Sequence, residues 1–290
     1  MLGSEFARQL KEKNIDFIGT GSELDVSDLS ALEEFVFGVK TSGRKIDFIV
    51  NCAAYTAVDK AESEIEQAAK VNTTGPKNLA TIANFLDATL IHVSTDYVFD
   101  GTGNVPYTED MSIAPIGAYG KTKADGEKTI IATAKKYYII RTAWLYGWNG
   151  KNFVYTMIRA MNMRDSVRVV NDQKGSPTFC GDLADVICKF VKSSAPYGVY
   201  HFTDEGEITW WDFTNEIKAQ GIKCGLITNE ACEVNPCTTD EYPTPAKRPA
   251  YSVLDKSKIQ NVLGMELPDW KDSLESFMNS RCFDKTRTEQ

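Results

Sequence analysis

The stretch Thr89-Leu90-Ile91-His92-Val93-Ser94-Thr95-Asp96-Tyr97 decides the predicted fold. Its first five residues are an apolar run with the length and composition of a buried strand in a parallel sheet. Ser94 and Thr95 then stand at the carboxyl end of that strand, which is the edge where open α/β sheets bind their ligands. The stretch therefore predicts a buried strand and also the position of a site.

Strand-like runs and helical patterns alternate on both sides of this stretch. The strand-like runs cover 15–18, 46–50 and 137–141, and the helical patterns cover 29–39 and 61–86. Such alternation is typical of a Rossmann-like α/β fold, in which a parallel sheet is doubly wound by helices.

The alternation loosens after about Trp148, where short mixed elements predict a smaller α+β lobe in the C-terminal part of the chain. We predict that residues 1–147 form the Rossmann domain and that 176–200 return to it. The ranges 148–175 and 201–290 would form the second lobe.

A second motif, Tyr119-Gly120-Lys121-Thr122-Lys123, places a phenol and an ammonium about one helical turn apart on the same helix face. Free tyrosine has a pKa near ~10, so a pKa of about 7 would require roughly 4 kcal/mol from neighbouring positive charges. A phenol tuned in this way can transfer a proton at neutral pH. Because a single Tyr-x-x-x-Lys match also occurs on ordinary exposed helices, the prediction depends on Thr95 lying at the nearby strand end.

Composition excludes several classes of function. The net charge of −8 argues against a nucleic-acid or anionic-membrane surface, and we find no apolar run of membrane-spanning length and no signal peptide, so a cytoplasmic location is the default. The seven cysteines include no C-x-x-C pair, so neither a disulfide framework nor a zinc site is predicted. Both histidines, His92 and His201, lie in apolar strand-like runs, and we expect structural roles for them.

The start of the chain departs from the usual order of a dinucleotide fold, which opens with a buried strand and a glycine-rich turn. Here the helical pattern of Phe6 and Leu10 begins at once, without a preceding strand. We expect Met1 to be an internal methionine of a longer protein. The rival expectation is that the chain folds as given, with a gap or another segment at the sheet centre.

Several further sequence motifs occur along the chain. They are Leu24-Asp25-Val26, Asn51-Cys52-Ala53-Ala54-Tyr55-Thr56-Ala57-Val58-Asp59-Lys60-Ala61-Glu62, Val71-Asn72, Arg141-Thr142-Ala143-Trp144, Asn171-Asp172-Gln173-Lys174-Gly175-Ser176-Pro177-Thr178 and Pro243-Thr244-Pro245-Ala246-Lys247-Arg248-Pro249. With these motifs the chain resembles the extended short-chain dehydrogenase/reductases over essentially its whole length, and within them the dTDP-4-dehydrorhamnose reductases.

The resemblance implies that NADPH, or NADH, delivers a hydride to the C4 carbonyl of a dTDP-linked 4-keto-6-deoxysugar. Tyr119 would protonate the developing alkoxide, Lys123 would lower the pKa of Tyr119 and bind the nicotinamide ribose, and Thr95 would hydrogen-bond the carbonyl oxygen. The residues implied to bind the sugar nucleotide are Thr95, Asp96, Tyr97, Trp144 and Arg248. Those implied to bind the cofactor are Met1, Leu2, Gly3, Asp25, Val26, Ala53, Ala54, Tyr55, Thr56, Asn72, Val93, Tyr119 and Lys123.

Met1 and Leu2 would match the last part of the pyrophosphate turn, just before its final glycine, Gly3. The range 19–21 lacks the acidic residue that selects against a 2′-phosphate, which leaves NADP open. Similar enzymes are often homodimers, some with Mg²⁺ at the interface, although no ligand set for this ion can be matched here.

Each single motif also has an ordinary structural explanation. Asp25 could cap the helix that begins near Asp28, Trp144 could pack in the core, and Lys247-Arg248 could be a solvated pair. Of the pair Trp210-Trp211, one ring could pack in the core and the other could be partly solvated. Two other functions stay open: a non-catalytic binding subunit, like the regulatory subunit of methionine adenosyltransferase, and a reductase or epimerase of another nucleotide sugar.

Overall fold

Four parallel strands form the central sheet of the computed structural model, which describes residues 1–288. Ile91 of the second strand lies between Val50 of the first and Tyr138 of the third. The parallel α/β fold predicted from the sequence is confirmed. In their order across the sheet, the strands are β1 (Phe48–Asn51), β2 (Thr89–Thr95), β3 (Tyr137–Thr142) and β8 (Gly198–His201).

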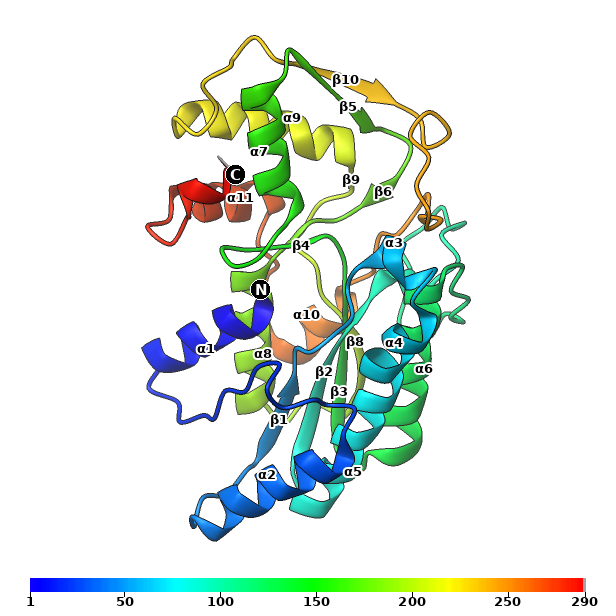
Figure 1. Ribbon diagram of the computed structural model, residues 1–290, viewed down its shortest axis with the longest axis vertical. Coiled ribbons are helices and arrows are strands. Elements are labelled where there is room, and N and C mark those ends of the chain that lie inside the picture. Colours follow the sequence, from blue (N-terminus) through cyan, green and yellow to red (C-terminus); the bar gives the residue numbers. More distant parts are fainter. Residues whose placement is uncertain (289–290) are drawn as a thin grey trace.

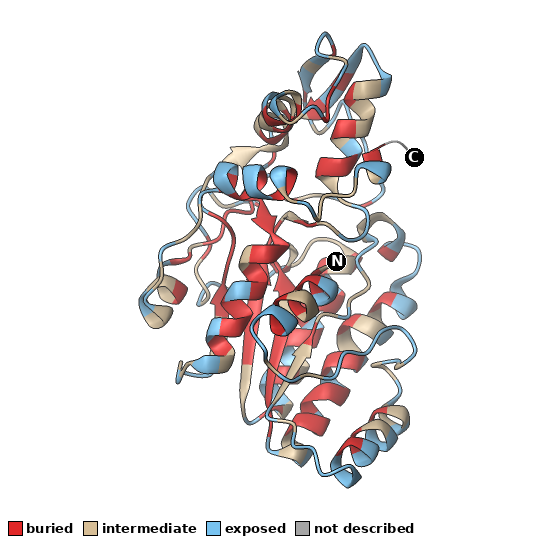
Figure 2. Ribbon diagram, turned by 90° about the vertical axis from the view of Figure 1, so that its left-hand side faces the viewer, coloured by how far each residue is buried: buried red, intermediate tan, exposed pale blue. Residues whose placement is uncertain are grey.

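Helices cover both faces of this sheet because successive side chains of a strand point to opposite faces (Figure 1). Leu90 and Ile139 face one helix layer, and Ile91 and Ile140 face the other. Figure 2 shows that the middle strands are buried along most of their length. The first layer consists of α2 (Leu29–Thr41), α5 (Gly75–Leu86) and α6 (Ala118–Thr133), and the second of α1 (Leu2–Glu12), α8 (Cys180–Lys192) and α10 (Ser257–Leu263).

Strand β1 lies at one edge of the sheet and pairs only with β2 among the described residues. The strand predicted at 15–18 does not form, so that expectation was wrong. Ile15 and Phe17 pack against the core on the α1 side, but this stretch forms no ladder with a neighbouring strand. A segment with alternating apolar residues can bury its side chains without pairing to another strand. It becomes a β-strand only when its backbone hydrogen-bonds to a neighbouring strand.

The single helix predicted over 61–86 is divided in the structure. Its pieces are α3 (Val58–Ala61), α4 (Ile65–Ala69), the π-helical segment η1 (Lys70–Thr74) and α5. A π-helical turn holds one more residue than an α-helical turn and often marks a functional position. Here it contains Asn72, one of the predicted cofactor residues.

A second apolar core lies away from the sheet, around Ile158, Phe213 and Phe277. It is formed by α7 (Phe153–Met163), α9 (Trp210–Lys223) and α11 (Trp270–Asn279), beside the parallel pair β5 (Ser166–Val170) and β10 (Glu233–Cys237). Short elements complete the described chain: η2 (Asp96–Val98), β4 (Leu145–Tyr146), β6 (Lys174–Gly175), β7 (Thr178–Phe179), β9 (Ile208–Thr209) and η3 (Lys285–Thr288).

Some segments return from the C-terminal half to the sheet. Helix α8 packs on α1, and β8 pairs with β3. Helix α10 packs against β8 through Ile259 and so lies with the sheet, although its residues fall within the range 201–290 that was assigned to the second lobe. The division of the chain into two domains stays a prediction.

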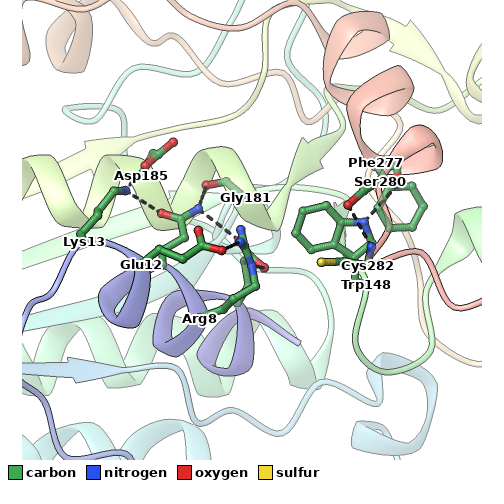
Figure 3. Close-up of polar contacts among 11 residues, drawn as sticks. Arg8, Glu12, Lys13, Trp148, Gly181, Asp185, Phe277, Ser280 and Cys282 are labelled. Carbon is green, nitrogen blue, oxygen red and sulfur yellow. Dashed lines mark hydrogen bonds and ion pairs between the residues drawn. The ribbon is translucent and has the colours of Figure 1, made fainter.

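Helix α1 contacts both parts of the molecule through polar side chains (Figure 3). Gln9 Nε2 donates to the carbonyl oxygen of Gly181, and Lys13 pairs with Asp185 of α8. The Arg8 guanidinium lies 5.1 Å from the ring centre of Trp148, which packs with the second core. Residues 1–288 include no helix that is long and apolar enough to cross a membrane.

Candidate active site

The carboxyl end of β2 carries three buried polar residues. Ser94, Thr95 and Asp96 are each no more than 5% exposed. Thr95 Oγ1 donates to Asp96 Oδ1 at 2.9 Å and accepts the backbone N–H of Tyr97 at 3.2 Å, which caps the short helix η2. Ser94 Oγ and Asp96 Oδ2 have no hydrogen-bond partner in the described part of the chain. Such unpaired buried groups are costly, and at a sheet edge they indicate a place for a polar ligand.

Helix α6 approaches η2, which follows this strand end, and η1 closely because two of its residues are glycines. A Cβ at Gly120 would lie 2.2 Å from the carbonyl oxygen of Tyr97, and a Cβ at Gly126 would lie 2.1 Å from that of Asn72. The first turn of α6 has no cap from its own N-cap residue, and Glu62 supplies one by accepting the N–H of Ala118 at 2.8 Å. The backbone contacts thus fix where the helix begins.

Tyr119 of α6 lies beside Tyr97 and Thr95. Its ring meets that of Tyr97 edge-on, with 5.5 Å between centres. Burial raises the pKa of Tyr119 to about 12, while a hydrogen bond with Thr95 lowers it and the charge of Asp96 raises it. The proximity of Thr95 and Tyr119 agrees with the predicted site, whereas the lowering of the Tyr119 pKa by Lys123 stays a prediction.

Lys123 is almost fully buried, at 1% exposure. Its Nζ donates to the carbonyl oxygen of Val93 at 2.7 Å and lies 3.2 Å from His92 Nε2. Burial lowers the pKa of Lys123 to about 8, against the opposing influence of Glu127 and Cys52. The side chain is therefore held against the sheet, behind the same strand end.

The loop after β1 supplies another group of predicted cofactor residues. Asn72 braces it, because its Oδ1 accepts the N–H of Tyr55 at 2.9 Å and its Nδ2 donates to the Tyr55 carbonyl at 3.1 Å. Ala53 and Thr56 are exposed, and Ala54 is partly buried. The side-chain amide of Asn72 thus links this loop to α6 and stabilises the loop.

The N-terminal residues of the predicted cofactor set lie near this loop. A Cβ on Gly3 would be 3.5 Å from Cys52 Cβ. The Met1 side chain lies beside Gly147. Leu2 is buried in the core between α1 and the sheet. The first turn of α1 therefore lies beside the carboxyl end of β1.

Asp25 and Val26 precede helix α2 in the structure. Asp25 does not cap that helix, because its Oδ1 accepts the N–H and hydroxyl of Ser27, and Asp28 accepts the N–H of Ala31 instead. Val26 packs against the residues around Leu79. Asp25 remains exposed at the rim of the sheet edge.

Asp96 is a predicted substrate residue whose pKa departs clearly from its usual value. Burial raises its pKa to about 6, opposed by the nearby hydroxyl of Ser252 and the hydrogen bond from Thr95. Ser252 was not predicted, since a serine in a loop after Arg248 has no distinguishing sequence signal. The contact brings the segment after Arg248 to the end of β2.

Trp144 and Arg248, the other two predicted substrate residues, belong to other parts of the chain. Trp144 has a φ of 47° and stacks on Trp210 with 3.6 Å between ring centres. Arg248 donates to both carboxylate oxygens of Asp59, at 3.1 and 3.0 Å. Burial lowers the pKa of Arg248, but the hydrogen bonds with Asp59 and the charges of its neighbours together outweigh burial, and the pKa is raised. Arg248 is also close enough to Tyr97 to influence its pKa.

A hydroxyl and a phenol thus lie together at one strand end, with a buried carboxyl beside them, and a lysine nitrogen contacts the same strand at Val93. This set can hydrogen-bond a carbonyl oxygen and give it a proton, which is the chemistry of carbonyl reduction when a hydride donor is present. No group of three or more histidine, cysteine, aspartate or glutamate side chains within residues 1–288 could hold a metal ion.

Comparison with known proteins gives consistent matches. The family model of the RmlD substrate binding domain matches residues 1–282. A dTDP-4-dehydrorhamnose reductase of Aggregatibacter actinomycetemcomitans is 42% identical over 260 residues, which cover 88% of this chain and 86% of that protein.

Two solved structures of enzymes with the same name are also similar. The Clostridium acetobutylicum structure has a TM-score of 0.88 and 43% identity, covering 96% of this chain and 95% of that chain. The Bacillus anthracis structure, a complex with NADP, has a TM-score of 0.86 and 35% identity, covering 95% and 94%.

Proposed function

This chain belongs to the family of the RmlD substrate binding domain and the dTDP-4-dehydrorhamnose reductases, and we propose from this premise that it reduces a nucleotide-linked keto sugar. The reaction is the NADPH-dependent reduction of the C4 keto group of dTDP-4-dehydro-β-L-rhamnose to dTDP-L-rhamnose. The product is a precursor for the biosynthesis of cell-surface polysaccharides.

One observation carries the proposal: Thr95, Tyr119 and Lys123 converge at the carboxyl end of β2. The same edge fits the nicotinamide end of a dinucleotide, since it offers a buried lysine nitrogen and the unpaired hydroxyl of Ser94. NADPH, when bound, supplies the hydride that adds to C4. NADH would supply the same hydride, and the B. anthracis complex favours NADPH.

The protein's own residues handle the oxygen and the proton. As C4 gains the hydride, negative charge develops on the carbonyl oxygen. Tyr119 donates a hydrogen bond to that oxygen, and the Thr95 hydroxyl donates a second one after its proton has turned from Asp96 Oδ1. Tyr119 then gives its proton to that oxygen, and solvent returns a proton to the tyrosinate. Lys123 binds the nicotinamide ribose and, as an ammonium, stabilises the tyrosinate.

The second lobe and the segment before Tyr251 hold the sugar nucleotide in this proposal. Arg248 carries the positive charge suited to a diphosphate, and its pairing with Asp59 fixes its direction. Trp144 contributes an aromatic ring that is held in place by its stacking on Trp210. A homodimer is compatible with the proposal but is not needed for these steps.

Turnover by the purified protein tests the function. We expect NADPH oxidation that depends on dTDP-4-dehydro-β-L-rhamnose, with dTDP-L-rhamnose as the product. A panel of other nucleotide-linked keto sugars separates this reaction from that of a related reductase or epimerase. If the folded protein binds the sugar nucleotide but oxidises no NADPH, a non-catalytic binding function replaces the proposal.

A further inference from the structure

His92 sits between two functional parts of the molecule, although its ring has no role in the reaction as described. It belongs to β2 and is 1% exposed. Its Nδ1 lies 3.0 Å from Nδ2 of Asn51, the last residue of β1. Its Nε2 lies 3.2 Å from Nζ of Lys123 on α6.

Asn51 determines which nitrogen of His92 carries the proton. The Asn51 Oδ1 accepts the N–H of Ala53 at 3.0 Å, so the amide Nδ2 is the atom turned toward His92. An amide nitrogen only donates, and the facing Nδ1 must therefore be an acceptor without a proton. Burial lowers the pKa of His92 well below its usual value and keeps the ring neutral. The single ring proton consequently resides on Nε2.

That proton points at the nitrogen of Lys123. An ammonium has three donors and no lone pair, whereas a neutral amine can accept one hydrogen bond. Lys123 Nζ already donates to the Val93 carbonyl. Only the amine form of Lys123 satisfies both contacts, because it donates to Val93 and accepts from His92.

The charged groups around Lys123 come from several elements. Glu127 lies one turn further along α6 and forms a buried ion pair with Arg141 of β3. Cys52 follows β1, and its thiol has a pKa raised to about 12 by burial. Glu127 favours the charged form of Lys123, whereas the Cys52 thiol is uncharged near neutral pH, and burial lowers the pKa of Lys123 to about 8. A hydrogen bond to the amine form lowers it further.

We propose that His92 is a positioning residue which, oriented by Asn51, donates its Nε2–H to Lys123 and holds that side chain as an uncharged amine against the sheet. Lys123 takes up a proton from solvent when it turns from His92 toward a ligand's hydroxyl groups. The ammonium charge thus arises with ligand binding. This inference rests on the proposed function only in the role given to Lys123.

The test measures the pKa of Lys123 directly, by NMR of protein labelled with ¹³C at the lysine ε-carbons. The signal of Lys123 is the one that a Lys123→Arg variant lacks. In the unliganded wild type we expect a pKa below about 8. A wild-type pKa at or above the ordinary lysine value of 10.5 would overturn the proposal without any further variant.

Asn51→Asp reverses the hydrogen-bond direction with almost no change of shape. The carboxylate still accepts the Ala53 N–H, and it now also accepts from His92 Nδ1–H. The lone pair on Nε2 then accepts from the Lys123 ammonium. We expect the pKa of Lys123 to rise by at least about one unit, a tenfold gain in proton affinity.

The negative charge that Asn51→Asp introduces would raise the pKa of Lys123 by Coulomb attraction even without His92, so the same change is made in a His92→Leu background. If His92 transmits the effect, the rise caused by Asn51→Asp falls to less than about half in that background. An equal rise in both backgrounds overturns the proposal. The measurement needs no turnover, so an inactive protein with the expected titrations would defeat the proposed function and leave this inference standing.

Discussion

The molecule has a packed centre, made of β2, β3 and α6, and a β1 rim, made of β1 and residues 13–28. In the packed centre nearly every residue of β2 is buried, and the ion pair of Arg141 with Glu127 is at most 5% exposed. At the β1 rim the first three strand residues are only partly buried, and the ion pair of Arg44 with Asp16 is exposed. The proposed catalytic groups therefore lie in the buried part of the molecule, while the predicted cofactor residues Asp25 and Val26 lie on more exposed chain.

The largest expected difference between these regions concerns the reaction itself. Tyr119→Phe removes the proposed proton donor in the packed centre and should lower kcat about 10³-fold, within the usual range for loss of an acid–base group. Steady-state kinetics with NADPH and the keto sugar provide the measurement. Tyr197→Phe, at a tyrosine that is 50% exposed and precedes β8, is the matched control and should leave kcat nearly unchanged. Equal loss in both variants would contradict the mechanism.

The two ion pairs provide a comparison of stability. Arg141→Met leaves the Glu127 carboxylate buried without its partner and should lower the free energy of unfolding by about 3–5 kcal/mol. Arg44→Met breaks the exposed pair at the β1 rim and should cost about 0–1 kcal/mol. Urea unfolding of both variants measures the two changes. Similar losses would show that the rim is packed as tightly as the centre.

Two aspartates should respond to pH in opposite directions. The folded-state pKa of Asp96 is about 6, above its usual 3.8, so the unfolded chain loses this proton first and stability falls as the pH rises between the two values. Asp96→Asn removes this fall in stability. The free energy of unfolding of the variant, relative to that of the wild type, should therefore increase by up to about 3 kcal/mol between pH 4 and pH 7.

Asp25 at the β1 rim should show the opposite dependence of stability on pH. The backbone N–H of Ser27 lowers the pKa of Asp25, so its stabilising contribution is present above the unfolded pKa and is lost as the pH falls through the folded one. Asp25→Asn should therefore cost more at neutral pH than at acidic pH. Urea unfolding at both pH values tests the pair, and the same sign for both variants would contradict this account.

The smallest expected effect compares two isoleucines at neighbouring positions of paired strands. Ile91→Val removes a methyl group from a side chain that is 0% exposed and should cost about 1 kcal/mol. Ile49→Val in β1 removes the same group from a partly buried side chain and should cost less than half of that. Thermal or urea unfolding detects the difference. A larger loss at Ile49 would place the tighter packing at the rim.

The packed centre was the part of the fold that the sequence predicted well. The run from Thr89 to Val93 and the run over 137–141 are strands because most of their side chains are apolar and both faces of the sheet are covered. The run 15–18 has a similar composition yet forms no strand, since strand formation also requires a neighbour that no local pattern reveals. The π-helical turn at Lys70–Thr74 likewise has no sequence signal of its own.

Prediction of the candidate site from the sequence has the same limit. Tyr119 and Lys123 share a helix, so their spacing alone predicts their common face, and Thr95 follows from the strand end. The contacts of Asp96 with Ser252, of Ala118 with Glu62 and of Lys123 with His92 join residues far apart in the chain. Such pairings depend on how α6 approaches β2. The close backbone contacts at Gly120 and Gly126 determine this approach.

The stacked pair of Trp144 and Trp210 has an optical consequence. Two indoles 3.6 Å apart and nearly parallel couple their electronic transitions, and they should give the folded protein a strong near-ultraviolet circular dichroism band. Because Trp144 precedes β4 and Trp210 begins α9, this band reports how those two elements sit against each other. The protein thus carries an intrinsic spectroscopic probe beside the proposed sugar-nucleotide site, which would register a bound sugar nucleotide without any label.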